Sequence, residues 1–150
     1  MTTVVTSNSP DETLRLGRRL AALLTAGDVV LLTGPLGAGK TLFVSGVAEG
    51  LGIAERITSP TFLIARVYRD GFLPLVHADV YRLGSMAEFD DLGILDDGAD
   101  GAVVIEWGEA VADAIPEDRL VIRFSADGET RRITLEPEGT WCERDLGVVA

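Results

Sequence analysis

The stretch that most constrains this chain is GPLGAGKT at residues 34–41, which directly follows the apolar run DVVLLT at residues 28–33. A continuous apolar run of this length is typical of a strand buried on both faces. The next stretch, KTLFVSGVAEGLG, predicts a helix that ends near Gly50 or Gly52. A strand, a Gly-x-x-x-x-Gly-Lys-Thr loop and a helix in this order form the pattern of a phosphate-binding loop.

The chemistry of such a loop requires these residue types. Glycines let successive backbone N–H groups turn inward and form a concave anion site at a helix N-terminus. Lys40, the only lysine in the chain, is expected to reach the β- and γ-phosphates, and the Thr41 hydroxyl to ligate Mg²⁺. The alternative is a glycine-rich turn with an incidental lysine, but strand, loop and helix all agree with the functional interpretation. The residues predicted to contact nucleotide here are Pro35, Leu36, Gly37, Ala38, Gly39, Lys40, Thr41 and Leu42.

Adenine is favoured over guanine as the base. Guanine-specific loops use an Asn-Lys-x-Asp element, and this chain has one asparagine, Asn8, and no second lysine. The chain also contains no glutamine, so any hydrolysis must orient its water without the glutamine of small GTPases.

Carboxylates downstream of the loop supply candidates for the metal and for catalysis. The apolar segment AVVIE ends in Glu106, the position of the usual acidic partner of Mg²⁺; a plain strand end is the alternative. HADVYRL at residues 77–83 places His77, Asp79 and Tyr81 on one side of an extended segment. Asp79 is expected to orient water or to support the metal indirectly, and His77 to have a hydrogen-bonded structural role. In SPTF at residues 59–62, Thr61 is either a γ-phosphate sensor or an ordinary strand start.

The remaining patterns predict one mixed α/β domain over residues 1–150, with a tail after about residue 137 that has no regular pattern. Residues 2–6 predict a strand, and residues 9–27 a helix with Ser9 as N-cap, Pro10 first and Glu12 in a capping box. Hairpins are expected over residues 61–80 and 119–137, a short helix over 85–93 and a buried strand over 101–107. The expected fold is a three-layer P-loop NTPase-like sandwich, a mixed sheet with helices on both faces and antiparallel hairpins.

Charge and composition limit the partners. The chain has 13 basic and 24 acidic residues and a net charge of -11, which makes it a poor autonomous binder of nucleic acid. No apolar stretch is long enough to cross a membrane. A single cysteine, Cys142, agrees with a reducing cytoplasm, which is the expected location.

Taken together, LTGPLGAGKT, SPTF, HADVYRL, EFDDLG and IEWGE, in this order and spacing, resemble the TsaE (YjeE) family over nearly the whole chain. The family consists of bacterial P-loop ATPases needed for the threonylcarbamoyl modification of adenosine in tRNA. The resemblance implies that Lys40 and Thr41 belong to the phosphate and Mg²⁺ site and that Glu106 supports the metal. It further implies that Asp79 is needed for hydrolysis.

By the same resemblance, Thr61 lies in a switch-like segment and Trp107 packs beside the nucleotide. The chain departs from the family where Leu42 replaces a frequent second Thr or Ser, which removes one possible nucleotide contact.

The resemblance also implies the partners TsaD and TsaB, which perform carbamoyl transfer and hold the tRNA, so tRNA is reached only indirectly. Full turnover is then expected to need these partners. Two rival functions stay open on the sequence. A small-molecule kinase would need an Arg-rich lid, whereas residues 84–100 are acidic. A nucleotide-gated scaffold without useful turnover would share the loop and the partner surface.

Overall fold

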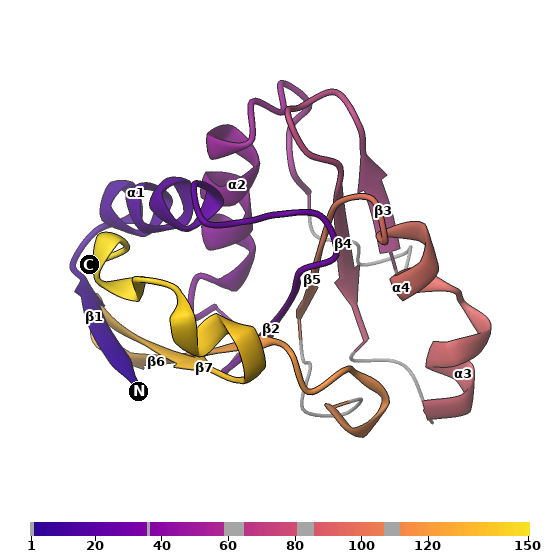
Figure 1. Ribbon diagram of the computed structural model, residues 1–150. Coiled ribbons are helices and arrows are strands. Elements are labelled where there is room, and N and C mark those ends of the chain that lie inside the picture. Colours follow the sequence, from indigo (N-terminus) through magenta and orange to yellow (C-terminus); the bar gives the residue numbers. More distant parts are fainter. Residues whose placement is uncertain (1, 36, 59–64, 81–85, 107–111) are drawn as a thin grey trace.

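A seven-stranded sheet forms the centre of the computed structural model, which describes residues 2–35, 37–58, 65–80, 86–106 and 112–150 (Figure 1). In spatial order the strands are β1 (Thr3–Ser7), β7 (Thr130–Pro137), β6 (Leu120–Asp127), β2 (Val29–Thr33), β5 (Ala102–Glu106), β4 (Leu75–Asp79) and β3 (Ala65–Tyr68).

The sheet is parallel at its centre and antiparallel at both ends. Strand β2 lies between β5 and β6 and is parallel to both, and β4 is parallel to β5. Strands β3 and β4 form the first predicted hairpin, and β6 and β7 form the second, with Asp127 opposite Thr130. Strand β1 pairs with β7, so the sheet is mixed, as predicted.

Helices cover both faces of this sheet. The faces separate along β2, where Val30 and Leu32 belong to one core cluster and Val29 and Leu31 to the other. Helices α1 (Pro10–Ala21) and α2 (Lys40–Gly50) pack on the first face, and α3 (Met86–Asp91) and α4 (Ile94–Asp97) contribute to the second. The predicted three-layer α/β fold is therefore confirmed.

Helix α1 begins as predicted and ends earlier than predicted. The Glu12 N–H donates to the Ser9 hydroxyl at 3.2 Å, and the Glu12 carboxylate accepts from the N–H of Asn8 at 2.6 Å, one residue before the position a capping box uses. The α-helix stops at Ala21. Leu23 and Leu24 then follow in tighter turns, with N–H groups bonded three residues back, so their helical spacing outlasts the helix itself.

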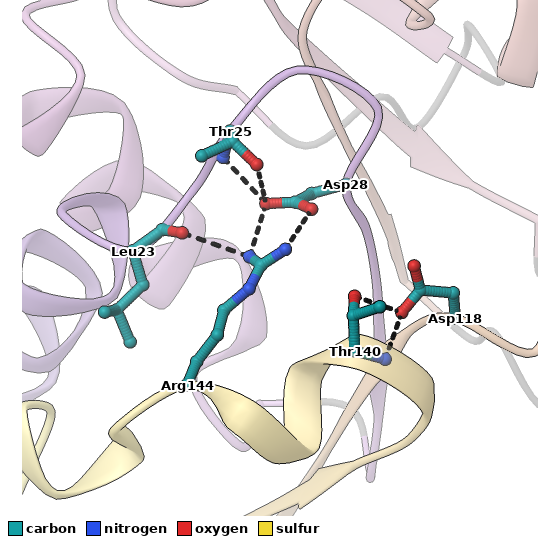
Figure 2. Close-up of polar contacts among 6 residues, drawn as sticks. All are labelled: Leu23, Thr25, Asp28, Asp118, Thr140 and Arg144. Atoms are coloured by element: carbon teal, nitrogen blue, oxygen red, sulfur yellow. Dashed lines mark hydrogen bonds and ion pairs between the residues drawn. The ribbon is translucent and has the colours of Figure 1, made fainter.

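The tail after β7 contains two short 3₁₀ helices, η2 (Gly139–Glu143) and η3 (Leu146–Val148), which pack on the α1 face. Trp141 of η2 is fully buried, and the Arg144 guanidinium lies 3.8 Å from the centre of its ring. Arg144 also donates to both oxygens of the buried Asp28 at 2.7 and 2.8 Å and to the Leu23 carbonyl at 3.1 Å (Figure 2). The hydrogen bond to Asp28 raises the pKa of Arg144, and this ion pair joins the tail to the start of β2.

A second contact holds the beginning of η2. Thr140 donates its backbone N–H and its hydroxyl to Asp118, each at 2.7 Å (Figure 2). These bonds favour the ionised carboxylate and lower the pKa of Asp118 below its ordinary value of 3.8.

No helix within the described ranges is long and apolar enough to cross a membrane.

Candidate nucleotide-binding site

The predicted site residues come together at one edge of the sheet. Because β2, β4 and β5 are parallel, their carboxyl ends lie at the same edge. Strand β2 leads into the glycine-rich loop there, β5 ends in Glu106, and β4 ends in Asp79. Open α/β sheets bind their ligands at this kind of edge.

The loop places a buried lysine at the start of α2. Gly34, Gly37 and Gly39 have φ angles of 137°, 80° and 98°, which are open to glycine and costly for other residues. Lys40 is 5% exposed, and its ammonium donates to the carbonyls of Gly34 at 2.6 Å and Pro35 at 3.0 Å. The lysine charge therefore lies within the loop, against the carbonyls of its first two residues.

Thr41 and Glu106, predicted together as the metal pair, are in contact. The Thr41 hydroxyl lies 3.3 and 3.2 Å from the two carboxylate oxygens of Glu106. Glu106 is 4% exposed, so its carboxylate is shielded from water and depends on such donors. The first turn of α2 and the end of β5 thus face each other across the site.

His77 is the second contact of the same carboxylate. It lies in the middle of β4, is fully buried, and its Nε2 is hydrogen-bonded to Oε2 of Glu106. His77 was expected to be hydrogen-bonded, and the structure identifies Glu106 as its partner, which the sequence pattern did not.

Asp79 lies beside Glu106. The two residues are register partners on adjacent parallel strands, so they lie at the same level of the sheet edge. By strand alternation, Asp79 and His77 point to one face, and Leu75 on the same side belongs to the core beneath α2. Tyr81, predicted on the same side, lies outside the described residues. The structure thus brings both predicted carboxylates to the face that α2 covers.

A pocket of about 420 Å³ opens beside the loop. The β1–α1 junction, the glycine-rich loop, the start of α2 and the tip of the β6–β7 hairpin line it. Its lining residues are Asn8, Ser9, Pro10, Thr13, Gly37, Gly39, Leu42, Glu129 and Arg131. Leu42, which the sequence assigned to the nucleotide, is among them.

These pocket residues outside the loop were missed by sequence reasoning. Thr13 lies close enough to the loop that a Cβ added at Gly39 would sit 3.8 Å from its methyl group. The tip of the β6–β7 hairpin lies near the loop because β6 is a direct neighbour of β2. No local sequence pattern predicts that pairing.

The oxygen donors present suit Mg²⁺ bound together with a phosphate. Among the described residues, no group of three or more His, Cys, Asp or Glu side chains is arranged to hold a metal ion alone. Mg²⁺ typically takes one or two protein oxygens and completes its shell with phosphates and water. The Thr41 hydroxyl and the Glu106 carboxylate supply hard oxygens of that number and kind.

Other predicted residues have a simpler placement or none. Pro35 is exposed, whereas Ala38 is 1% exposed and donates its N–H to the Pro35 carbonyl at 3.2 Å. Leu36, Thr61 and Trp107 lie outside the described residues.

A central parallel strand, a glycine-rich loop, a helix that begins with a buried lysine, and an acidic strand end beside its threonine define a P-loop protein of the α/β class. The family model for "Threonylcarbamoyl adenosine biosynthesis protein TsaE" matches residues 7–134. The chain belongs to the TsaE family.

Relatives and a solved structure agree with this assignment. The chain is 48% identical over 145 residues to the tRNA threonylcarbamoyladenosine biosynthesis protein TsaE of Streptomyces coelicolor, covering 90% of this chain and 97% of the relative. It is 44% identical over 135 residues to the protein of that name from Bacillus subtilis, covering 87% and 83%. The crystal structure of Bacillus subtilis YdiB superposes with a TM-score of 0.78 and 36% identity, covering 95% of this chain and 93% of YdiB.

Proposed function

We propose that this chain is the ATP-binding and ATP-hydrolysing component of the machinery that makes threonylcarbamoyladenosine in tRNA. The observation that carries the proposal is the pairing of Thr41 with Glu106 directly beside the loop that contains Lys40. The names of the relatives supply the biological process, since several are tRNA threonylcarbamoyladenosine biosynthesis proteins.

In this proposal the loop holds the phosphates of ATP and the neighbouring pocket holds its base. Backbone N–H groups of the loop and the N-terminus of α2 attract the phosphate charge. Lys40 exchanges its loop carbonyls for phosphate oxygens when nucleotide binds. Thr41 and Glu106 would hold Mg²⁺, and the ion would supply positive charge beside the phosphates. Asp79 orients the water that receives the terminal phosphate, while Thr61 and Trp107 remain proposed nucleotide contacts.

The proposed partners are TsaD and TsaB, which bring the tRNA. A net charge of -11 disfavours direct binding to a phosphate backbone, so the grip on tRNA is assigned to the partners. The chain has no glutamine to position water, and hydrolysis is therefore expected to be slow alone and faster in the assembly. The proposed setting is the cytoplasm.

The test is ATP hydrolysis by the protein alone and with TsaD, TsaB and tRNA, with Glu106→Ala as the blank. Stimulation by the partners that is lost in the blank supports the proposal. Nucleotide binding without any stimulated hydrolysis would instead identify a nucleotide-gated scaffold, and phosphorylation of a small metabolite would identify a kinase.

A binding measurement tests the phosphate site separately. Lys40→Ala removes a charge-assisted contact and is expected to weaken Mg-ATP binding roughly 10- to 100-fold. Arg15→Ala, at an exposed position of α1, is the control and should bind like the wild type. Equal affinity of Lys40→Ala and wild type would rule out the phosphate role of the lysine.

A further inference from the structure

His77 is a buried polar residue that packing alone does not explain. It is fully buried in β4, and its neighbours along that strand, Leu75, Val76 and Ala78, are apolar and buried. A leucine or phenylalanine would fill such a position without burying polar nitrogens. Nδ1 of His77 has no hydrogen-bond partner among the described residues, so the ring is satisfied there on one side only, by Glu106.

Within the described part of the chain, the hydrogen bond that the ring makes is directed at the proposed metal ligand. With its proton on Nε2, the imidazole donates to Oε2 of Glu106, and Thr41 approaches the same carboxylate at 3.2 and 3.3 Å. A glutamate has three rotatable side-chain bonds, and holding them in one geometry costs rotamer entropy. A donor from β4 on one side and a donor from α2 on the other hold the carboxylate in one orientation before any ligand binds.

We infer that His77 is a positioning residue, which holds the Glu106 carboxylate against Thr41 so that the Mg²⁺ ligands are preformed. The inference rests on the proposed function, since it assigns Glu106 to the metal of a bound nucleotide. Residues that hydrogen-bond a metal ligand from behind orient it, and losing one typically lowers metal affinity or activity about 10- to 100-fold. His77 is therefore expected to act on the Mg²⁺-dependent part of nucleotide binding and not on the loop itself.

Two amide side chains of different length separate positioning from packing. In His77→Gln the amide nitrogen reaches about as far as Nε2 and can still donate to Glu106. In His77→Asn it reaches only about as far as Nδ1 and cannot. Both variants bury one amide, but asparagine is one methylene shorter and leaves a larger void. Thermal unfolding of each variant therefore measures its own effect on folding.

The experiment is calorimetric titration of wild type and both variants with ADP, once with excess Mg²⁺ and once with EDTA. His77→Asn is expected to bind ADP in EDTA within about twofold of wild type and to lose about tenfold of the affinity that Mg²⁺ adds. His77→Gln is expected to recover most of that loss. In a Glu106→Gln background, His77→Asn should cause no further loss, because the residue acts through Glu106.

Other results overturn the inference. If His77→Asn keeps the full Mg²⁺ effect, the carboxylate does not need the histidine. If Asn and Gln weaken ADP binding equally with and without Mg²⁺, His77 has a packing role only. If wild type binds no nucleotide at all, the proposed function fails and the inference fails with it. If wild type binds ADP more tightly with Mg²⁺ and His77→Asn does the same, only the inference fails.

Discussion

Gly34 and Gly37 both have positive φ angles in the phosphate-binding loop, but the space around them differs. A Cβ added at Gly34, where φ is 137°, would lie 2.5 Å from the carbonyl oxygen of Phe124 on β6. A Cβ added at Gly37, where φ is 80°, would have no atom of the described residues within 4 Å, apart from its chain neighbours. The absence of a side chain at Gly34 therefore allows the loop to pack against β6. At Gly37, glycine is needed for the positive φ angle, and the open space beside it is where the proposed nucleotide would lie.

This difference predicts opposite effects of two alanine substitutions. Gly34→Ala is expected to lower the free energy of unfolding by about 3 kcal/mol or more, because it adds a clash to backbone strain. Gly37→Ala should cost only about 1–2 kcal/mol while weakening nucleotide binding. Urea unfolding and calorimetric titration with ADP measure the two quantities. A Gly34→Ala protein as stable as Gly37→Ala would contradict the packing argument.

Asp118 makes a pH-dependent contribution at the residue scale. Its pKa is lowered below 3.8 in the folded protein by the two hydrogen bonds from Thr140. The stability from these bonds is therefore fully present well above pH 3.8, and it is lost progressively as the pH falls through 3.8 and then through the lowered pKa. We expect wild type to be more stable than Asp118→Asn at neutral pH, and the difference to shrink between about pH 5 and about pH 2. Urea unfolding of both proteins along this pH series measures it; a difference that stays constant would show that the charge of Asp118 is not involved.

The candidate site was predictable from the sequence where a motif carries its own chemistry. Lys40, Thr41 and Glu106 fall into this group, because strand, loop and acidic strand end have a fixed order in P-loop proteins. The contact between His77 and Glu106 was not predictable, because it depends on which strands are neighbours and in what register. The roles of all these residues in binding and hydrolysis stay predictions, and Leu36, Thr61 and Trp107 lie outside the described residues.

At the scale of elements, α1 and α2 pack with their backbones in contact. A Cβ added at Gly46 of α2 would overlap the carbonyl of Leu14 on α1, and one added at Gly17 would overlap the carbonyl of Phe43. Glycines on both helices thus allow an approach that any side chain would prevent. Since α2 begins with Lys40 and Thr41, this packing also positions the proposed phosphate site.

Gly46→Ala is accordingly expected to destabilise the protein, although alanine is the better helix former. We expect a loss of about 2–3 kcal/mol in the free energy of unfolding, because the overlap outweighs the gain of about 1 kcal/mol in helix propensity. Arg15→Ala, on the exposed side of α1, should stay within about 0.5 kcal/mol of wild type. Urea unfolding measures both, and a Gly46→Ala variant more stable than wild type would show that the helices can separate without cost.

Most elements were predictable because each has a local cause. The apolar run of β2, the turn at Asp127-Gly128 and the N-cap at Ser9 all operate over a few residues. The end of α1 at Ala21 was not predictable from spacing, because Leu23 and Leu24 remain directed toward the core through tighter turns. Hydrophobic periodicity reports burial, and it cannot distinguish an α-helix from the 3₁₀-type turns that continue it.

At the scale of the whole molecule, the tail from η2 onward is joined to the opposite end of β2 from the phosphate site. Arg144→Ala removes two hydrogen bonds to Asp28, one to the Leu23 carbonyl and the contact with Trp141. Among the described residues, the buried carboxylate then keeps its donors from Thr25. We expect the free energy of unfolding to fall by about 2–4 kcal/mol. The loss stays below the full penalty of a broken buried pair because Arg144 is partly exposed. Arg144→Lys should recover only part, because an ammonium cannot bond both carboxylate oxygens in the same geometry.

Urea unfolding of both variants measures this effect, with ADP affinity as the control. Nucleotide binding should be unchanged in both variants, since Asp28 precedes β2 and the loop follows it. A stability of Arg144→Ala within about 0.5 kcal/mol of wild type would mean that the tail contact contributes nothing measurable.

The fold class was predictable at this scale, and the arrangement was not. Two hairpins, a buried parallel strand and two long helices indicate a three-layer α/β sandwich with a mixed sheet. That β6 and β5 are the neighbours of β2 is a property of distant segments, which local pattern does not encode. The tail shows the same limit, because its contact partner Asp28 lies more than a hundred residues earlier.

The strand order has a consequence for the folding of this protein during its synthesis on the ribosome. The phosphate-binding loop is translated early, but both neighbours of its strand, β5 and β6, come late, and β1 must wait for β7. At typical rates of synthesis the loop and its apolar strand remain unpaired for on the order of ten seconds. Fragments that end before β6 would contain the complete loop but leave one edge of the apolar strand β2 unpaired. Interrupted synthesis should therefore yield aggregates and not a smaller nucleotide-binding module.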